Sequence, residues 1–158
     1  MLWAVTTEIE RKFVVSDPPP GDVLGPGVRL RQGYLAEDGE VQVRVRLAGG
    51  AATLTVKAGR GLRRTEVEAA IAVEAAEALW PFTAGRRVEK VRHRVALGSL
   101  VADVDVYEGA LAGLCTAEVE FASEEEARRF LPPPWFGRDV TGEAGWDNAA
   151  LARHGRPG

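Results

Sequence analysis

The chain has 158 residues, a length typical of one domain, with one cysteine and two histidines. These counts exclude a framework of intrachain disulfides and nearly exclude a structural zinc site, which takes four ligands mostly from Cys and His. The formal net charge is −3, whereas general nucleic-acid binders carry a basic excess, so we expect no nucleic-acid partner. Seventeen of the basic residues are arginines and only three are lysines: Lys12, Lys57 and Lys90.

The N-terminal segment Met1 to Val15 does not read as a signal peptide, because charged residues between Glu8 and Lys12 interrupt any apolar run. No stretch of the chain approaches the roughly 20 apolar residues that a spanning helix needs. We therefore expect a cytoplasmic protein with no membrane partner.

Between turns rich in glycine and proline, the sequence alternates with a period of two, which is typical of β-strands. Val41 to Leu47 alternates almost strictly, and Glu37-Asp38-Gly39 before it and Gly49-Gly50 after it indicate hairpins. Short strands joined by tight turns predict an antiparallel barrel or sandwich. The eight expected strands are Thr7 to Val15, Gly27 to Leu35, Val41 to Leu47, Thr53 to Ala58, Arg64 to Ala69, Val88 to Leu97, Leu100 to Tyr107 and Thr116 to Phe121.

Helices are fewer. Ala72 to Leu79 is rich in Ala and Glu, and Pro81 stops it. Ser123 to Glu126 forms a capping box that starts a helix ending near Leu131. A short last helix is expected from Asp147-Asn148 through His154. The predicted class is mainly β (α+β), in a single domain over residues 1–158.

Each expected strand has an apolar face and a heavily charged face. In a sandwich, the apolar faces form the core and the charged faces meet water. In a closed barrel, the charges could instead point inward, and helices or a partner subunit would then cover the apolar exterior, which makes a homodimer one way of covering it. The charged face comprises eight carboxylates and seven cations: Glu8, Glu10, Lys12, Arg44, Arg46, Lys57, Arg64, Glu66, Glu68, Lys90, Arg92, Asp103, Asp105, Glu118 and Glu120.

Charges that point inward would favour the binding of particular ligands. Crowded carboxylates without Cys or His select a hard cation, Mg²⁺ or Mn²⁺. The interleaved arginines and lysines supply charge-assisted donors for phosphate oxygens. A lumen that holds both kinds of group implies a metal-bound polyanion, for which a chain of phosphates is the natural candidate.

The segment Glu8-Ile9-Glu10-Arg11-Lys12 resembles the E-x-E-x-K signature of the CYTH superfamily, the triphosphate tunnel metalloenzymes. The resemblance covers the chain from about Thr7 to Leu151. Within the superfamily, the chain resembles the small bacterial members most. It also rests on the order of Gln32-x-Tyr34, Arg44-x-Arg46, Lys57, Arg64-x-Glu66-x-Glu68, Lys90-x-Arg92, Asp103-x-Asp105 and Glu118-x-Glu120.

The resemblance implies a closed eight-stranded antiparallel tunnel with a charged lumen that binds triphosphate, and a C-terminal helix near one mouth. It places the activating metal at Glu8, Glu10 and Glu120 and a second at Glu68 and Asp105, with Glu118 in the same carboxylate set. Asp103 departs from the glutamate expected in many relatives, so its role as a ligand is the weakest. The residues implied to grip the phosphates are Lys12, Arg44, Arg46, Lys57, Arg64, Lys90 and Arg92.

For the reaction, we expect metal held partly by Glu10 to polarise the terminal phosphoryl group and to orient water. Tyr34 shares parity with the lumen residues and could pair with Lys90, either to position a water or as a structural hydrogen bond. His93 has the opposite parity, and Cys115 reads as a buried small apolar residue.

The leading hypothesis is a metal-dependent triphosphatase that splits inorganic triphosphate into diphosphate and phosphate. Thiamine triphosphatase, nucleoside triphosphatase and adenylate cyclase of the same family remain alternatives, as does a non-catalytic polyphosphate-binding module. We do not expect Trp3, Trp80 or Trp135 to stack against a base or a thiamine ring inside the lumen. This favours a substrate that is a bare phosphate chain.

Overall fold

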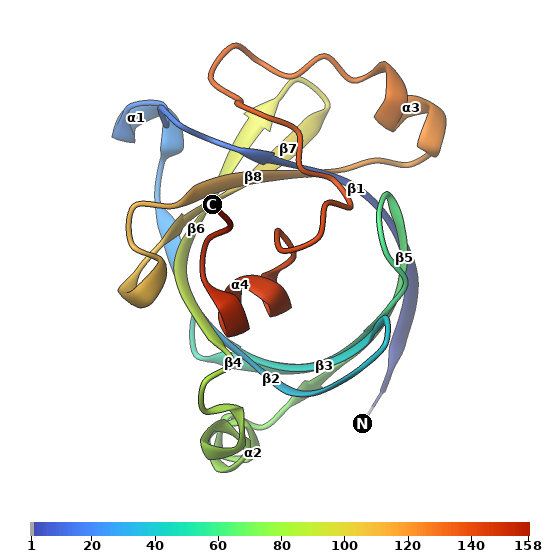
Figure 1. Ribbon diagram of the computed structural model, residues 1–158, viewed down its shortest axis with the longest axis vertical. Helices are drawn as coiled ribbons and strands as arrows, with labels where there is room; N and C mark the ends of the chain where they lie inside the picture. The colour runs from blue at the N-terminus through green and yellow to red at the C-terminus, as the bar shows by residue number, and fades with distance from the viewer. Residues whose placement is uncertain (1) are drawn as a thin grey trace.

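The computed structural model describes residues 2–158 and shows eight antiparallel strands closed into one barrel (Figure 1). The order around the barrel is β1-β5-β4-β3-β2-β6-β7-β8. The sandwich alternative is therefore wrong. The strands are β1 (Ala4–Val14), β2 (Gly27–Asp38), β3 (Val41–Ala48), β4 (Ala51–Ala58), β5 (Arg63–Ile71), β6 (Arg87–Leu97), β7 (Leu100–Tyr107) and β8 (Cys115–Glu120).

Closure depends on β1, whose two halves pair with different strands. Its first half pairs with β5, from Ala4 opposite Glu68 to Ile9 opposite Arg63. Its second half pairs with β8, where Glu10 lies opposite Glu120. The first and last strands of the chain are thus joined at the position of the E-x-E-x-K segment.

The alternation along each strand sorts side chains between the lumen and the exterior. Lys12, Lys90 and Asp105 are buried inside the barrel, although they are charged. Val5, on the opposite parity of β1 from Lys12, is exposed on the outside. The charges point inward because other parts of the chain cover the apolar faces on the outside of the barrel, in two clusters.

One external cluster lies over β1, β7 and β8, where Phe13, Val104 and Val119 are at most 1% exposed. Helix α3 (Glu124–Arg129) and the segment that follows it, with Phe136, cover this part of the wall (Figure 1). Ser123 caps α3 by accepting from the Glu126 amide at 3.1 Å, as predicted.

A second cluster covers β3 and β4 on another side of the barrel. Val45 and Leu47 pack there against α2 (Val73–Leu79) and against Trp80, which opens the 3₁₀ helix η1 (Trp80–Thr83). Three short elements were not predicted, because four or fewer residues carry too little periodicity: α1 (Gly21–Leu24), η1 and the 3₁₀ helix η2 (Gly109–Leu111).

The last helix, α4 (Asn148–His154), lies within the ring of strands when the barrel is viewed end-on (Figure 1). Asp147 caps it by accepting from the Ala150 amide at 3.0 Å, which confirms the predicted start. The sequence predicted a helix near one mouth, and the structure places it inside that end.

A bulge in β2 allows α4 to be held there. The register between β2 and β3 shifts between Tyr34 and Ala36, which reverses the parity of the residues that follow. Glu37 therefore turns inward and pairs with Arg153 of α4 at 3.0 Å. In residues 2–158, no helix has the length and apolar character needed to cross a membrane.

Candidate active site

The lumen holds a cavity of about 450 Å³ to which all eight strands contribute side chains. Because every strand presents its charged parity to the interior, residues far apart in the sequence meet around one space. Lys90 and Asp105 are fully buried in the wall and do not line the cavity. The predicted site residues that line it are Glu8, Glu10, Lys12, Tyr34, Arg44, Arg46, Lys57, Arg64, Glu68, Arg92, Glu118 and Glu120.

Two neighbouring arginines of β3 form a cationic part of the wall. Arg46 donates from Nε and Nη2 to Gln32 Oε1, at 3.3 and 3.1 Å. Burial lowers the pKa of Arg46 to about 10, and the nearby Arg44 and Arg92 add to the effect. An anion bound beside these arginines would relieve the repulsion between their positive charges.

Two arginines of the lumen each have a hydrogen-bond donor without a partner. Among the described residues, the Nε atoms of Arg44 and Arg64 are buried without a hydrogen bond. A buried donor left unsatisfied is costly, on the order of 1–3 kcal/mol. These atoms indicate a place where phosphate oxygens could accept.

Lys57 stands between two carboxylates on neighbouring strands. Its Nζ lies 2.9 Å from Glu8 and 3.1 Å from Glu66. Burial raises the pKa of Glu66, but the attraction of Lys57 outweighs it and leaves that pKa below its usual range. Lys57 thus offsets part of the negative charge on this side of the lumen.

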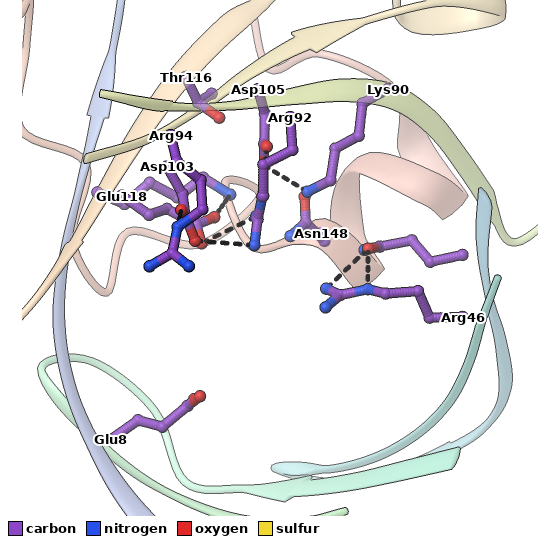
Figure 2. Close-up of polar contacts among 12 residues, drawn as sticks. Glu8, Arg46, Lys90, Arg92, Arg94, Asp103, Asp105, Thr116, Glu118 and Asn148 are labelled. Atoms are coloured by element: carbon purple, nitrogen blue, oxygen red, sulfur yellow. Dashed lines mark hydrogen bonds and ion pairs between the residues drawn. The ribbon is translucent and has the colours of Figure 1, made fainter. Parts of the chain in front are cut away.

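The strands β6, β7 and β8 carry a second network, which Figure 2 shows on the opposite side of the lumen from Glu8. Arg92 lies 2.7 Å from Asp105, 3.0 Å from Asp103 and 3.6 Å from Glu118. Lys90 donates to Asp105 at 2.5 Å.

This network affects two carboxylates that were predicted to bind metal. Burial raises the pKa of Asp105, but Lys90 and Arg92 lower it further and leave it below its usual range. Glu118 behaves in the same way through Lys12, which lies 3.3 Å away, and Arg92. The arrangement favours a counter-ion role for Asp105 and Glu118 over metal coordination.

The carboxylates of Glu10 and Glu120 stand in a different environment. Burial raises the pKa of Glu10 to about 7, and the nearby charges of Glu118 and Glu8 contribute. Partial burial and the charge of Glu8 also raise the pKa of Glu120, an exposed residue that lies opposite Glu10 in the β1–β8 ladder. Crowded carboxylates whose negative charge Lys57 only partly offsets fit a hard divalent cation.

In residues 2–158, no three His, Cys, Asp or Glu side chains gather closely enough to form a ready metal site. The reason is visible at Glu8, which Lys57 holds at 2.9 Å. A metal that takes Glu8 as a ligand therefore competes with this ion pair.

Tyr34 and Lys90 each have a partner other than the one expected. Gln32 donates from Nε2 to Tyr34 Oη at 3.3 Å, while Lys90 binds Asp105. The expected pair between Tyr34 and Lys90 is therefore wrong for this structure. Burial lowers the pKa of Lys90 to about 7, and Arg92 adds to this against the attraction of Asp105.

The carboxylates lie between two openings of the lumen. A second hollow of about 390 Å³ has Ser99, Leu100 and Arg94 on its rim. It shares four residues with the main cavity: Glu10, Asp103, Glu118 and Glu120. The two hollows thus meet at these carboxylates.

Comparisons with known proteins agree with this geometry. A family model described as the CYTH domain matches residues 6–139. The chain belongs to the CYTH domain family. It is 46% identical over 149 residues to an inorganic triphosphatase of Nitrosomonas europaea, covering 92% of this chain and 97% of that protein. It is 36% identical over 152 residues to an inorganic triphosphatase of Acetivibrio thermocellus, covering 93% and 94%.

A solved structure shows that the CYTH barrel extends over almost the whole chain. The crystal structure of the inorganic triphosphatase NE1496 superposes with a TM-score of 0.71 at 42% identity, covering 96% of this chain and 98% of that one. The closed antiparallel barrel expected from the resemblance is therefore confirmed.

In this CYTH chain, the end of the tunnel is built by the predicted helical region from Trp146 to His154 and by residues 141–145, which were not predicted to lie there. Trp146 and the segment Thr141 to Asp147 line the cavity together with His154. Tyr107 donates to Asn148 of α4 at 2.8 Å, which ties this helix to β7. Residues 142–145 have no periodicity, so no pattern predicted their place in the tunnel wall.

Proposed function

We propose that this chain is an inorganic triphosphatase that uses a divalent cation, Mg²⁺ or Mn²⁺, to hydrolyse the terminal phosphoanhydride. One observation carries the proposal: a single cavity presents both arginine donors without a hydrogen-bond partner and the crowded carboxylates of Glu8, Glu10 and Glu120. The two relatives named inorganic triphosphatase, both aligned over more than nine-tenths of this chain, support the same substrate.

The phosphate chain would lie along the cationic wall. Arg44 and Arg64 have buried Nε atoms without partners, and Arg46 is crowded by its neighbours. Planar guanidinium groups bind phosphate oxygens in a fork, whereas a lysine contributes a compact charge. The proposed phosphate-binding residues that line the cavity are Lys12, Arg44, Arg46, Lys57, Arg64 and Arg92.

Glu10 and Glu120, with Glu8, would hold the cation. When bound, the cation supplies neutralisation of phosphate charge and polarisation of the phosphoryl group. Glu68 remains the candidate for a second cation, although Thr55 donates to it at 2.6 Å. Asp105 is left out of this set, because Lys90 and Arg92 bind both of its oxygens.

Tyr34 is proposed to donate its hydroxyl proton into the cavity. Arg46 donates to the Oε1 atom of Gln32, which fixes the amide so that its Nε2 donates to Tyr34 Oη. Because Tyr34 Oη accepts this bond, its own proton is free to point toward a phosphate oxygen or an attacking water. Lys90 would act from the wall through Asp105 rather than by contact with substrate.

The cavity favours a phosphate chain without an attached ring. Trp146 borders it, but this side chain is only 6% exposed and packs against Val140 and Leu151. Its face is therefore not available for a nucleobase or a thiamine ring, which supports inorganic triphosphate over ATP and thiamine triphosphate.

The test is phosphate release from inorganic triphosphate, ATP and thiamine triphosphate, each with Mg²⁺ or Mn²⁺ after removal of bound metal. We expect triphosphate to be split fastest, and Glu120→Gln to lose most turnover while Glu125→Gln, on the exposed face of α3, retains it. Tight binding without release would instead indicate a polyphosphate-binding module. Cyclic nucleotide formed from ATP would indicate a cyclase.

A further inference from the structure

The second half of β1 is held on its free edge by a segment from near the end of the chain. β1 pairs with β5 only as far as Ile9, which leaves the later residues without a strand on that side. Gly137 and Arg138 take over by exchanging backbone bonds with Val14 at 2.8 and 2.9 Å. The Val140 amide then donates to the Lys12 carbonyl at 2.8 Å. This segment completes the tunnel wall beside Lys12.

The Lys12 amide is bound by a side chain of the same segment. It donates to Thr141 Oγ1 at 3.0 Å, so both backbone polar groups of Lys12 contact residues 140–141. The Thr141 hydroxyl has one proton, which it donates to Asp139 Oδ1 at 2.5 Å. With its proton committed, Thr141 turns a lone pair toward the Lys12 amide.

Asp139 is fixed from outside the barrel. Its other oxygen, Oδ2, accepts from Arg11 Nε and Nη2 at 3.1 and 2.8 Å. Arg11 also donates to the carbonyls of Ala127 and Phe130, and its guanidinium stacks 5.0 Å above the ring of Phe13. This arginine therefore ties β1, the end of α3 and Asp139 into one cluster.

Burial raises the pKa of Asp139, but hydrogen bonds from Thr141 and Arg11 outweigh it and hold that pKa below its usual range. The carboxylate is therefore ionised at neutral pH and accepts from both neighbours at once. A chain of hydrogen bonds, charge-assisted at Asp139, runs from Arg11 on the exterior to the backbone of Lys12.

We propose that Asp139 and Thr141 are positioning residues that set the place of the Lys12 ammonium group in the tunnel. This inference rests on the proposed function, in which Lys12 binds phosphate. The Lys12 side chain is only 10% exposed and lies 3.3 Å from Glu118, so a shift of its backbone would move the ammonium group within a crowded lumen. Displacements of about 1 Å at such groups cost large factors in rate.

The test compares Thr141→Val, which keeps the shape and removes the hydroxyl, with Thr141→Ser, which keeps the hydroxyl. Thr7→Val, on the exposed outer parity of β1, is the matched control. The readouts are the Kd for inorganic triphosphate by calorimetry in EDTA, the KM and kcat with Mg²⁺, and the melting temperature. We expect Thr141→Val to weaken triphosphate binding on the order of tenfold, and Thr141→Ser and Thr7→Val to bind as the unaltered protein does.

A purely structural role predicts a different pattern. If Thr141→Val lowers only the melting temperature and leaves Kd and KM unchanged, or if Thr141→Ser is as impaired as Thr141→Val, the positioning role is overturned. The variant Lys12→Met distinguishes a failure of the positioning role from a failure of the proposed function. Weak triphosphate binding by Lys12→Met with normal binding by Thr141→Val refutes the positioning role alone. Normal binding by Lys12→Met refutes the phosphate-binding role of Lys12 in the proposed function itself.

Discussion

Replacing Glu10 by Gln should make the metal-free protein more stable at high pH while it abolishes turnover. Glu10 lies in the lumen opposite Glu120, with Glu118 and Glu8 among the charges that act on it. The substitution keeps the shape of the side chain and removes one negative charge from this group. Stability and activity should therefore change in opposite directions.

The magnitude follows from the pKa of Glu10, which burial and its neighbours raise from 4.5 to about 7. The folded protein then binds this proton more tightly than the unfolded chain does, so stability falls as the pH rises from about 4.5 through about 7. At about 1.4 kcal/mol per pKa unit, the loss from this one group amounts to about 3 kcal/mol by pH 8. Glu10→Gln lacks the titrating group and should not show this loss.

The assay is urea unfolding in EDTA at several values between pH 4.5 and pH 8, for the unaltered protein, Glu10→Gln and the exposed-site control Glu125→Gln. Between these limits the unaltered protein and the control should lose about 3 kcal/mol more than Glu10→Gln. Excess Mg²⁺ should restore stability at pH 8 in the unaltered protein but much less in Glu10→Gln. Identical pH profiles in all three proteins would refute the reasoning.

Three further predictions follow from single contacts. Lys57→Met removes the ammonium group that holds Glu8 at 2.9 Å, so it should raise the KM for triphosphate and tighten Mn²⁺ binding in a calorimetric titration; weaker Mn²⁺ binding would count against Glu8 as a ligand. Lys12→Arg puts a larger, planar cation in the lumen and should lower kcat/KM at least tenfold; full activity would show that arginine serves equally well there. Gly142→Ala should destabilise the fold more than Gly155→Ala in chemical unfolding, by about 1 kcal/mol or more. Both glycines have positive φ, +71° and +78°, but only at Gly142 would the new Cβ meet another backbone, at 2.9 Å from the Cα atom of Gly61. Equal losses of stability in the two variants would contradict this reasoning.

Much of the barrel could be predicted from the sequence because strand parity is a local property. Alternation placed Lys12 and Lys57 on the charged face, and both line the cavity. The same parity could not tell that Lys90 lies in the wall, bound to Asp105. Period two reports which face a residue occupies, but its partner across the barrel depends on register and stagger.

The bulge in β2 shows the same limit. It follows Tyr34 and turns Glu37 inward to meet Arg153 of α4, and no local pattern in the sequence marks it. The segment beside Lys12 was missed for another reason: it pairs with β1 as irregular backbone, without alternation. A signal was present in Asp139-Val140-Thr141, because an Asp two residues before a Thr commonly accepts from that residue's amide in a turn.

The most direct test of the account is ³¹P NMR of inorganic triphosphate incubated with the metal-free protein, before and after addition of Mg²⁺ or Mn²⁺. The account predicts no change without metal and, after its addition, equal amounts of diphosphate and phosphate. Triphosphate that stays intact in the presence of either metal, although it binds to the protein, would contradict the central claim.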